Sequence, residues 1–219
     1  MTIVANLDFS ADLGQTHCQG VRPTCLAFAL SDLNRHANNV HPTLSAEYLY
    51  RSAAKLMPTW QAGYGLQLIP ALEAVAKPGQ PTALACPYTV SEPTEQFPCL
   101  PDLSAFPANE SKLYVSTLQA IDMKSKMLEF ELQNRKPIGL VLRLTESFYK
   151  PVEGIVAFSN NHLNGCNHAV IAVGLGTHAV THEPHVLIRN TWGVGWGNAG
   201  NAWLPFKFID IHAVKAFKV

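Results

Sequence analysis

The spacing of apolar residues predicts four helices in the first part of the chain. They are expected at Thr24–Asn38, Ser45–Met57, about Leu66–Ala76, and Asp122–Asn134. In the first segment Leu26, Leu30, Leu33 and Ala37 recur at i, i+4, i+7 and i+11, which is the spacing of one helix face. Thr24 precedes this face and is expected to cap the helix N-terminus.

The pattern changes after the fourth helix, where Met123, Met127 and Phe130 form one apolar stripe. Short apolar runs bounded by Gly, Asn and Pro then predict strands. They lie at Ile138–Leu144, Ala169–Gly174, His185–Arg189 and Asn201–Phe208. The Pro-rich segment Gln80–Asn109 is expected to be a loop that connects two lobes.

Helices and strands are thus segregated along the chain, which favours an α+β fold over alternating β-α units. The length of 219 residues fits a single domain, residues 1–219, with a helical lobe at about 1–105 and a β-rich lobe at about 106–219. A hydrophobic content of 47% and a charged content of 15% argue against intrinsic disorder.

The charge balance argues against two classes of binding partner. Sixteen Lys and Arg residues match sixteen Asp and Glu residues, so no basic surface is indicated for nucleic acid or for an anionic membrane. The longest apolar stretches, such as Ile138–Leu142 and Ala169–Val173, are far shorter than the roughly 20 residues that cross a bilayer. We therefore expect neither a nucleic-acid partner nor a membrane partner.

The five cysteines indicate a reducing compartment. Their odd number and the absence of a CxxC pair are untypical of a disulfide framework or a zinc ribbon. The N-terminal residues lack the apolar core of a secretory signal, and a cytoplasmic location is expected. Cys86 and Cys99 flank the Pro-rich loop, and it stays open whether they form a disulfide.

Three separated residues suggest nucleophilic chemistry. Cys25 lies in the first turn of a predicted helix, where the helix dipole favours a thiolate. His168 comes 143 residues later, just before an apolar strand, and Asn190 follows a further 22 residues on. Taken singly, each has a structural explanation, as a buried thiol, a strand-edge histidine and a turn residue. Together they have the order of a Cys–His–Asn catalytic set.

The motifs around these residues extend the match. Three segments resemble those of papain-like (C1 family) cysteine peptidases. They are Gln19-Gly20…Cys25-Leu26-Ala27-Phe28, His168-Ala169-Val170 and Asn190-Thr191-Trp192-Gly193-Val194-Gly195-Trp196-Gly197. Gly65, Ala71-Leu72 and Pro87-Tyr88 give a weaker match. The resemblance covers about Gln19 to Phe208.

The resemblance implies a role for each matched residue. Cys25 would be the nucleophile, and His168 would take its proton and later protonate the leaving amine. Asn190 would hold the imidazole in the productive tautomer. Gln19 would stabilise the oxyanion together with the Cys25 backbone N–H.

Substrate contacts are implied as well. Gly65 would let an extended peptide pair with the backbone, and Trp192 would shield the His–Asn hydrogen bond beside the substrate. The implied fold is a papain-like helical lobe packed against a β-rich lobe, with the active-site cleft between them. The implied substrate is a peptide or protein, cleaved through a thioester acyl-enzyme.

Two departures from the family pattern stand out. Arg22, Pro23, Thr24 and Leu26 surround Cys25 where most members have Cys-Gly-Ser-Cys-Trp, so a half-cystine common in secreted members is missing. Only 18 residues precede Gln19, and no inhibitory pro-segment is expected. Narrow specificity, a regulatory protein partner or a regulated cleft is expected to restrain activity instead.

Alternative functions remain at this point. The acyl-enzyme could serve an amidase or transpeptidase acting on a non-protein substrate, or the chain could be a catalytically silent binding module. No cofactor and no metal are expected. His178, His182 and His185 have an H-x3-H-x2-H spacing, but the residues between them favour a loop or hairpin over a helical zinc site.

Overall fold

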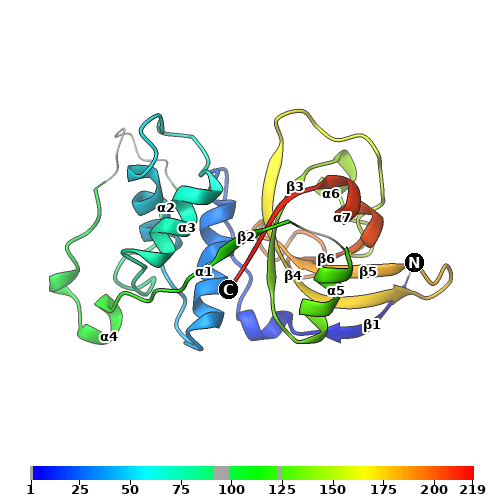
Figure 1. The fold of residues 1–219 in the computed structure, drawn as a ribbon, viewed down its shortest axis with the longest axis horizontal. Helices are drawn as coiled ribbons and strands as arrows, with labels where there is room; N and C mark the ends of the chain where they lie inside the picture. The colour runs from blue at the N-terminus through cyan, green and yellow to red at the C-terminus, as the bar shows by residue number, and fades with distance from the viewer. Residues whose placement is uncertain (1, 91–98, 123–124) are drawn as a thin grey trace. The chain divides into compact units, whose positions relative to one another are not determined.

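The computed structural model describes residues 2–90, 99–122 and 125–219. The chain groups into two compact units (Figure 1). The sheet unit comprises Met1–Cys18 and Ile121–Lys218, and the helical unit comprises Gln19–Ala120. The first eighteen residues, expected in the helical lobe, group with the sheet because strand β1 (Ile3–Asp8) pairs with a strand of that sheet.

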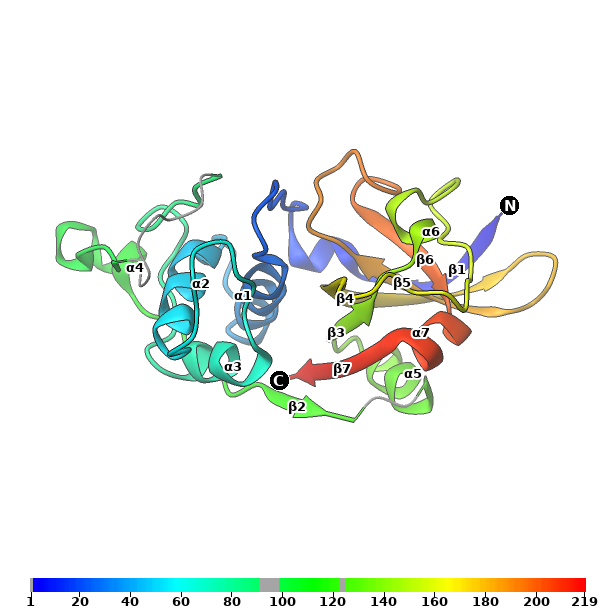
Figure 2. The same cartoon turned by 90° about the horizontal axis from the view of Figure 1, so that it is seen from above.

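Three of the predicted helices form the helical unit, and all three are confirmed (Figure 2). They are α1 (Cys25–Ala37), α2 (Ala46–Lys55) and α3 (Leu68–Ala76). The 3-10 turn η2 (Leu103–Ala105), the short helix α4 (Ala108–Ser111) and the short strand β2 (Gln119–Ile121) follow. No helix of the described residues has both the length and the apolar character needed to cross a membrane.

Helix α1 buries the face that its sequence predicts, with Leu26, Leu30 and Leu33 all inaccessible to solvent or nearly so. Ala37, the last residue of the predicted face, is exposed because it lies in the final turn of the helix. Burial therefore extends over ten consecutive residues of α1, from Leu26 to Arg35.

The N-cap residues of α1 and α2 make different contacts. Ser45 caps α2, because its hydroxyl accepts a hydrogen bond from the backbone N–H of Tyr48 at 2.9 Å. Thr24 occupies the N-cap position of α1, but its side chain makes no capping hydrogen bond. Its hydroxyl lies instead 2.9 Å from the hydroxyl of Tyr88, so the prediction of a side-chain cap was wrong.

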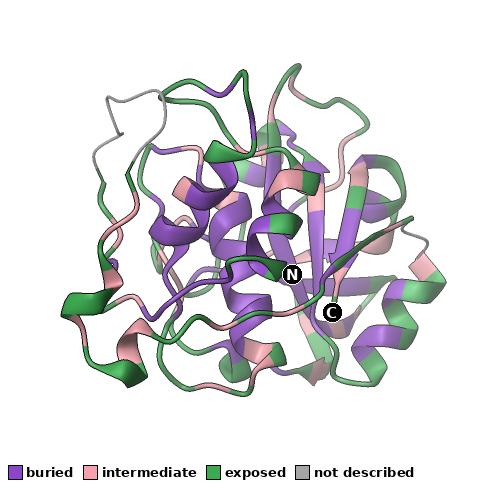
Figure 3. Ribbon diagram, turned by 60° about the vertical axis from the view of Figure 1, so that its left-hand side comes forward, coloured by how far each residue is buried: buried purple, intermediate pink, exposed green. Residues whose placement is uncertain are grey.

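Aromatic residues are prominent in the core of the helical unit, whose helices are buried along much of their length (Figure 3). Trp60 and Tyr50 are fully buried and meet edge to face with their ring centroids 5.8 Å apart. Phe28 of α1 belongs to the same cluster, and its ring centroid lies 4.8 Å from that of Tyr88. Burying side chains of this size supplies much of the hydrophobic stabilisation of a small unit. Helix α1, which carries the predicted nucleophile, is therefore firmly packed.

The sheet unit is an antiparallel sheet in which β4 is the longest strand. Its strands are β1, β3 (Ile138–Arg143), β4 (Asn167–His178), β5 (Pro184–Arg189), β6 (Asn201–Pro205) and β7 (Ala213–Lys218). The order β7-β3-β4-β5-β6 joins strands that are hydrogen-bonded neighbours, and β1 also pairs with β4. The turn η1 (Ser10–Leu13) and the helices α5 (Ser125–Gln133), α6 (Glu146–Tyr149) and α7 (Phe206–His212) complete the unit.

Strand β4 is long enough to have two partners along one edge. Its first half pairs with β3, its second half pairs with β1, and β5 pairs along the other edge. Both the β1 and the β5 registers shift near Gly174, where a Cβ atom would collide with the carbonyl oxygen of Leu7. Glycine is therefore needed at this bulge, where the backbones approach closely.

The predicted strand Asn201–Phe208 ends earlier than expected. Strand β6 stops at Pro205, and helix α7 begins at the next residue. Proline has no N–H to donate, so it suits the end of a strand and the position before a helix. Phe208, Ile209 and His212 of α7 are buried at helical spacing, a pattern that the sequence analysis did not use.

The fourth predicted helix is present as α5, but its buried face is not the predicted one. Met127 and Phe130 are exposed, while Leu128 and Leu132 are fully buried. Met123, the other member of the predicted stripe, lies outside the described residues. The i, i+4 pair of leucines faces the sheet, so the apolar residues of this helix occupy both of its faces.

The predicted hairpin in the His-rich segment is confirmed, because β4 and β5 pair directly across it. His178 and His185 stack with their ring centroids 6.0 Å apart, and the Nδ1 of His185 lies 3.0 Å from the carbonyl oxygen of Glu183. Burial lowers the pKa of His185 below its ordinary 6.5; His178 lowers it further, and Glu183 partly offsets this. The folded protein therefore favours the neutral imidazole.

We expect the His185 site to make the protein less stable in mild acid. In the unfolded chain the His185 imidazole binds a proton near pH 6.5, but in the folded protein it does so only at lower pH. The free energy of unfolding therefore falls as the pH drops through 6.5. His185→Asn keeps a donor for the Glu183 carbonyl but does not titrate, and denaturant melts between pH 8 and 5 should show a flatter dependence.

His182→Asn is the matched control. His182 is exposed in the same hairpin with a φ of 58°, a conformation that asparagine tolerates. This variant should retain the wild-type pH dependence. Equal slopes for wild type and His185→Asn would contradict the assignment.

Candidate active site

The strand register brings His168 and Asn190 together in the sheet unit. His168 lies on β4 opposite Leu142 of β3, and Asn190 directly follows Arg189, which pairs with Ile171 of β4. Continuing this register places Asn190 opposite residue 170, whose side chain leaves β4 on the same face as that of His168. The two side chains are therefore diagonal neighbours, a spacing that polar side chains can bridge.

A short hydrogen bond connects the pair. The His168 Nε2 lies 2.6 Å from the Asn190 Oδ1, and both residues are buried. The same Oδ1 accepts the backbone N–H of Thr191 at 2.8 Å. Since a carbonyl oxygen only accepts, Nε2 must carry a hydrogen, and in the neutral ring Nδ1 then holds the lone pair.

Aromatic side chains enclose this hydrogen bond. The Trp192 ring lies 4.7 Å from the His168 ring between centroids, and Phe148 lies 6.0 Å from His168 on a fully buried position. Tyr149 stacks on Trp192 at 5.1 Å, and Trp196 donates its indole N–H to the Phe148 carbonyl at 2.9 Å. An apolar enclosure of this kind keeps water away and strengthens the bond inside it.

Cys25 is the first residue of α1 and is half-buried. Its thiol and backbone N–H therefore lie at the positive end of the helix dipole, which favours negative charge. The described cysteines form no disulfide; Cys86 is buried, and Cys18 and Cys99 are exposed.

The loop before Cys25 is held by hydrogen bonds within the helical unit. The buried Gln19 donates its Nε2 to the carbonyl of Arg22 at 2.7 Å. Tyr88 donates its hydroxyl to the Gln19 carbonyl at 2.7 Å and also contacts the hydroxyl of Thr24. The side-chain amide of Gln19 and the N-terminus of α1 thus share one anchored loop.

Gly65 lies on an exposed loop of the same unit. A Cβ atom placed on it would meet the Pro23 carbonyl oxygen at 3.6 Å and the Pro23 Cβ at 3.8 Å, which is ordinary contact. Gly65 is therefore next to the segment that precedes Cys25. The adjacent carbonyl of Tyr64 accepts the Tyr50 hydroxyl at 2.6 Å and the Trp60 indole N–H at 3.1 Å, which fixes the loop.

The predicted residues thus form two groups. His168, Asn190 and Trp192 lie together in the sheet unit, and Gln19, Cys25 and Gly65 lie in the helical unit. Sequence reasoning did not find the enclosing Phe148 and Tyr149, for which no motif gave a signal. The Pro87-Tyr88 match was noted, but the role of Tyr88 in anchoring the Gln19 loop was not.

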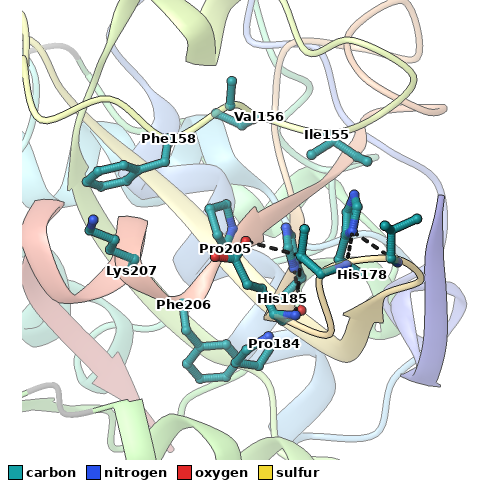
Figure 4. A pocket seen from close by; sticks show the side chains of 13 residues that line it. Ile155, Val156, Phe158, His178, Pro184, His185, Pro205, Phe206 and Lys207 are labelled. Carbon is teal, nitrogen blue, oxygen red and sulfur yellow. Dashed lines mark hydrogen bonds between the residues drawn. The ribbon is translucent and has the colours of Figure 1, made fainter. Parts of the chain in front are cut away.

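A separate cavity of about 590 Å³ lies in the sheet unit (Figure 4). Phe158 and Lys207 line one side of it and His178 and His185 the other. None of the predicted site residues lines this cavity. Within the described ranges, no group of three His, Cys, Asp or Glu side chains is arranged to hold a metal ion.

Comparison with known proteins identifies the family and the fold of the chain. The papain family cysteine protease profile matches residues 15–207. Among solved structures, digestive procathepsin L 3 of Tenebrio molitor has a TM-score of 0.76 at 17% identity, covering all of this chain and 70% of that one. Xylellain, a cysteine protease from Xylella fastidiosa, has a TM-score of 0.73 at 20% identity, covering 99% of this chain and 86% of that one. At these identities the likeness concerns the fold, which is the α+β fold expected from the sequence.

Curated relatives match shorter stretches. Cathepsin B-like cysteine proteinase 5 of Caenorhabditis elegans is 30% identical over 121 residues, which is 53% of this chain and 33% of that protein. Cathepsin C of Schistosoma mansoni is 32% identical over 83 residues, which is 34% of this chain and 18% of that protein. The matches thus span a third or less of these relatives. Since the family profile covers most of the chain, the chain belongs to the papain family of cysteine proteases.

Proposed function

We propose that the protein is a cysteine endopeptidase that hydrolyses peptide bonds through a thioester acyl-enzyme. Cys25 is the nucleophile, His168 the base, and Asn190 the residue that orients the base. The observation that carries the proposal is the buried hydrogen bond between His168 Nε2 and Asn190 Oδ1, because it leaves Nδ1 as the nitrogen able to take a proton.

The chemical steps follow from these roles. His168 Nδ1 takes the thiol proton, and the Cys25 sulfur attacks the carbonyl carbon of the peptide bond. The tetrahedral intermediate collapses when the imidazolium gives its proton to the leaving amine, which leaves a thioester. Water, deprotonated by the same imidazole, then attacks the thioester, releases the acid and regenerates the thiol. Asn190 stabilises the imidazolium throughout by accepting its Nε2 hydrogen.

Gln19 and the Cys25 backbone N–H supply the oxyanion donors in this proposal. The anchored Gln19 side chain is pre-organised, so its amide reorganises little when charge develops on the oxygen. One such donor contributes about 10²–10³ to kcat in acyl transfer. Trp192 supports the site by covering the His168–Asn190 bond on the side where substrate is proposed to lie.

We propose peptides or proteins as substrates, bound in extended form along Gly65. Its exposed backbone and missing side chain suit strand-like pairing with a peptide. The amidase or transpeptidase alternative uses the same residues on a non-protein substrate: an amidase would hydrolyse an amide of that substrate, and a transpeptidase would pass the acyl group to an amine. A cytoplasmic location is also proposed, supported by described cysteines that form no disulfide. A regulatory protein partner remains a further proposal.

Replacing Cys25 tests the function directly. Cys25→Ala should lower hydrolysis of a proteome-derived peptide library by at least about a thousandfold, because no other described group takes over the covalent step. Mass spectrometry of the products separates hydrolysis from transfer to an amine. Circular dichroism checks that the variant folds.

Cys99→Ala is the matched control, since Cys99 is an exposed cysteine outside the proposed machinery. It should cleave the library like wild type and take up one equivalent of a thiol-directed epoxide, whereas Cys25→Ala takes up none at the active site. A wild-type protein that cleaves nothing would indicate a binding module. Labelling of Cys18 with Cys25 untouched would remove the assignment.

Gly65→Ala tests the substrate site. The new methyl group makes only ordinary contacts within the protein, so folding should be unaffected, but it should obstruct a peptide backbone. We expect KM to rise about fivefold or more with kcat within about twofold of wild type, the signature of lost uniform binding.

Gly63→Ala serves as the comparison. Gly63 has a φ of 85° and open space around it, so alanine strains the backbone and lowers the stability without filling the peptide path. Its KM should stay near the wild-type value. An unchanged KM in Gly65→Ala would place the substrate elsewhere.

A further inference from the structure

Arg22 is the most deeply buried cation of the helical unit that the structure describes. Only 1% of the residue is exposed, although it lies three residues before the proposed nucleophile. Arginine is almost never fully buried unless its charge is paired, so this side chain must be held by specific partners.

Glu47 of α2 provides the charge partner. Its Oε2 lies 2.6 Å from the Arg22 Nη1 and its Oε1 lies 3.4 Å from Nη2, so the guanidinium faces the carboxylate with both nitrogens. Glu47 is fully buried and also accepts the Nε of Arg51 at 2.7 Å. Nη1 of Arg22 further donates to the carbonyl oxygen and the hydroxyl of Thr89. The planar guanidinium group can donate to all of these acceptors at once, which restricts the side chain to one orientation.

Two aromatic rings complete the enclosure of Arg22. The guanidinium carbon lies 5.1 Å from the Tyr50 ring centroid and 4.9 Å from that of Tyr88. Both distances are in the range of cation–π contacts, which strengthen when water is excluded. The Arg22 side chain thus touches the same tyrosine whose hydroxyl holds the Gln19 carbonyl.

The backbone of Arg22 is connected to the proposed oxyanion donors. Its carbonyl accepts the Gln19 side-chain amide at 2.7 Å and the Thr24 backbone N–H at 2.9 Å. The position of the Arg22 backbone therefore determines where the Gln19 amide lies and how the chain enters α1 at Cys25.

We propose that Arg22 is a positioning residue for the peptidase reaction. Its buried ion pair with Glu47 locks the Gln19–Cys25 loop, so that the Gln19 amide and the Cys25 N–H are held where the oxyanion forms. At this position the family pattern commonly has a half-cystine, and here an ion pair anchors the loop non-covalently. The inference rests on the proposed function, because it assigns Arg22 an effect on that reaction.

The test compares kcat and KM per active site. Arg22→Met removes the guanidinium and should lower kcat about tenfold to a hundredfold, which is less than the full loss of one oxyanion donor because the donor is displaced and not deleted. KM should stay within about twofold. Titration with an irreversible thiol-directed inhibitor counts the competent sites, so unfolded protein does not enter the rate.

A double variant keeps the test decisive if the single variant folds poorly. Arg22→Met with Glu47→Leu removes both charges of the buried pair, and the partly exposed Arg51 keeps its hydrogen bond to the Cys99 carbonyl. The double variant should therefore recover part of the lost thermal stability. Its kcat should remain low, because the loop has not regained its anchor. Recovery of kcat together with stability would show that Arg22 acts on folding alone and would overturn the proposal.

Arg35→Met is the matched control. Arg35 is another buried arginine of the helical unit, and it donates to the carbonyl oxygens of Val40 and His41 at the far end of α1. Its loss should lower the stability but leave kcat per titrated site unchanged. A similar fall in kcat for this variant would mean that the effect of Arg22→Met is not specific to the loop.

A double-mutant cycle with Gln19 tests the route of the effect. If Arg22 acts by placing the Gln19 amide, Arg22→Met should lower kcat less than about threefold in a Gln19→Ala background. An undiminished effect there would contradict the proposal. Wild type without peptidase activity would refute the proposed function, whereas active wild type with an unchanged kcat in Arg22→Met would refute only the role of Arg22.

Discussion

The hydrogen bond between His168 and Asn190 is the constraint on which the proposed chemistry depends. An imidazole has two nitrogens, and a base with the wrong tautomer cannot accept a proton from a thiol. The antiparallel register of β4 and β5 brings the two side chains together, and the buried Asn190 oxygen selects the tautomer. Trp192 and Phe148 then exclude water from the bond. The sheet thus supplies orientation as well as stability.

The helical unit fixes the Gln19–Cys25 loop, whereas the sheet unit fixes the His168 imidazole. Cys25 gains its position from α1, whose apolar face is buried along most of its length. The residues before the helix have no regular structure of their own, so side chains must fix them. Tyr88 and the buried pair of Arg22 and Glu47 do this with directional contacts that leave the loop few alternative conformations.

The sequence predicted local features better than long-range ones. Three helices of the helical unit and the principal strands follow from periodicity, and the catalytic candidates follow from short motifs. The end of β6 at Pro205 was missed although the proline itself favours the end of a strand. The buried face of α5 was missed because apolar residues occupy both faces of this helix, and only packing against the sheet distinguishes them. The partnership of Arg22 with Glu47 was not predictable either, since nothing local connects residues 25 positions apart.

The reactivity of the Cys25 thiol tests the central claim most directly. If His168 draws the proton from Cys25, an alkylating agent such as iodoacetamide should modify Cys25 at pH 5 at least about tenfold faster in wild type than in His168→Ala. Peptide mapping assigns the modified residue. Equal rates of Cys25 alkylation in the two proteins at that pH would contradict the pairing of thiol and imidazole, and with it the proposed mechanism.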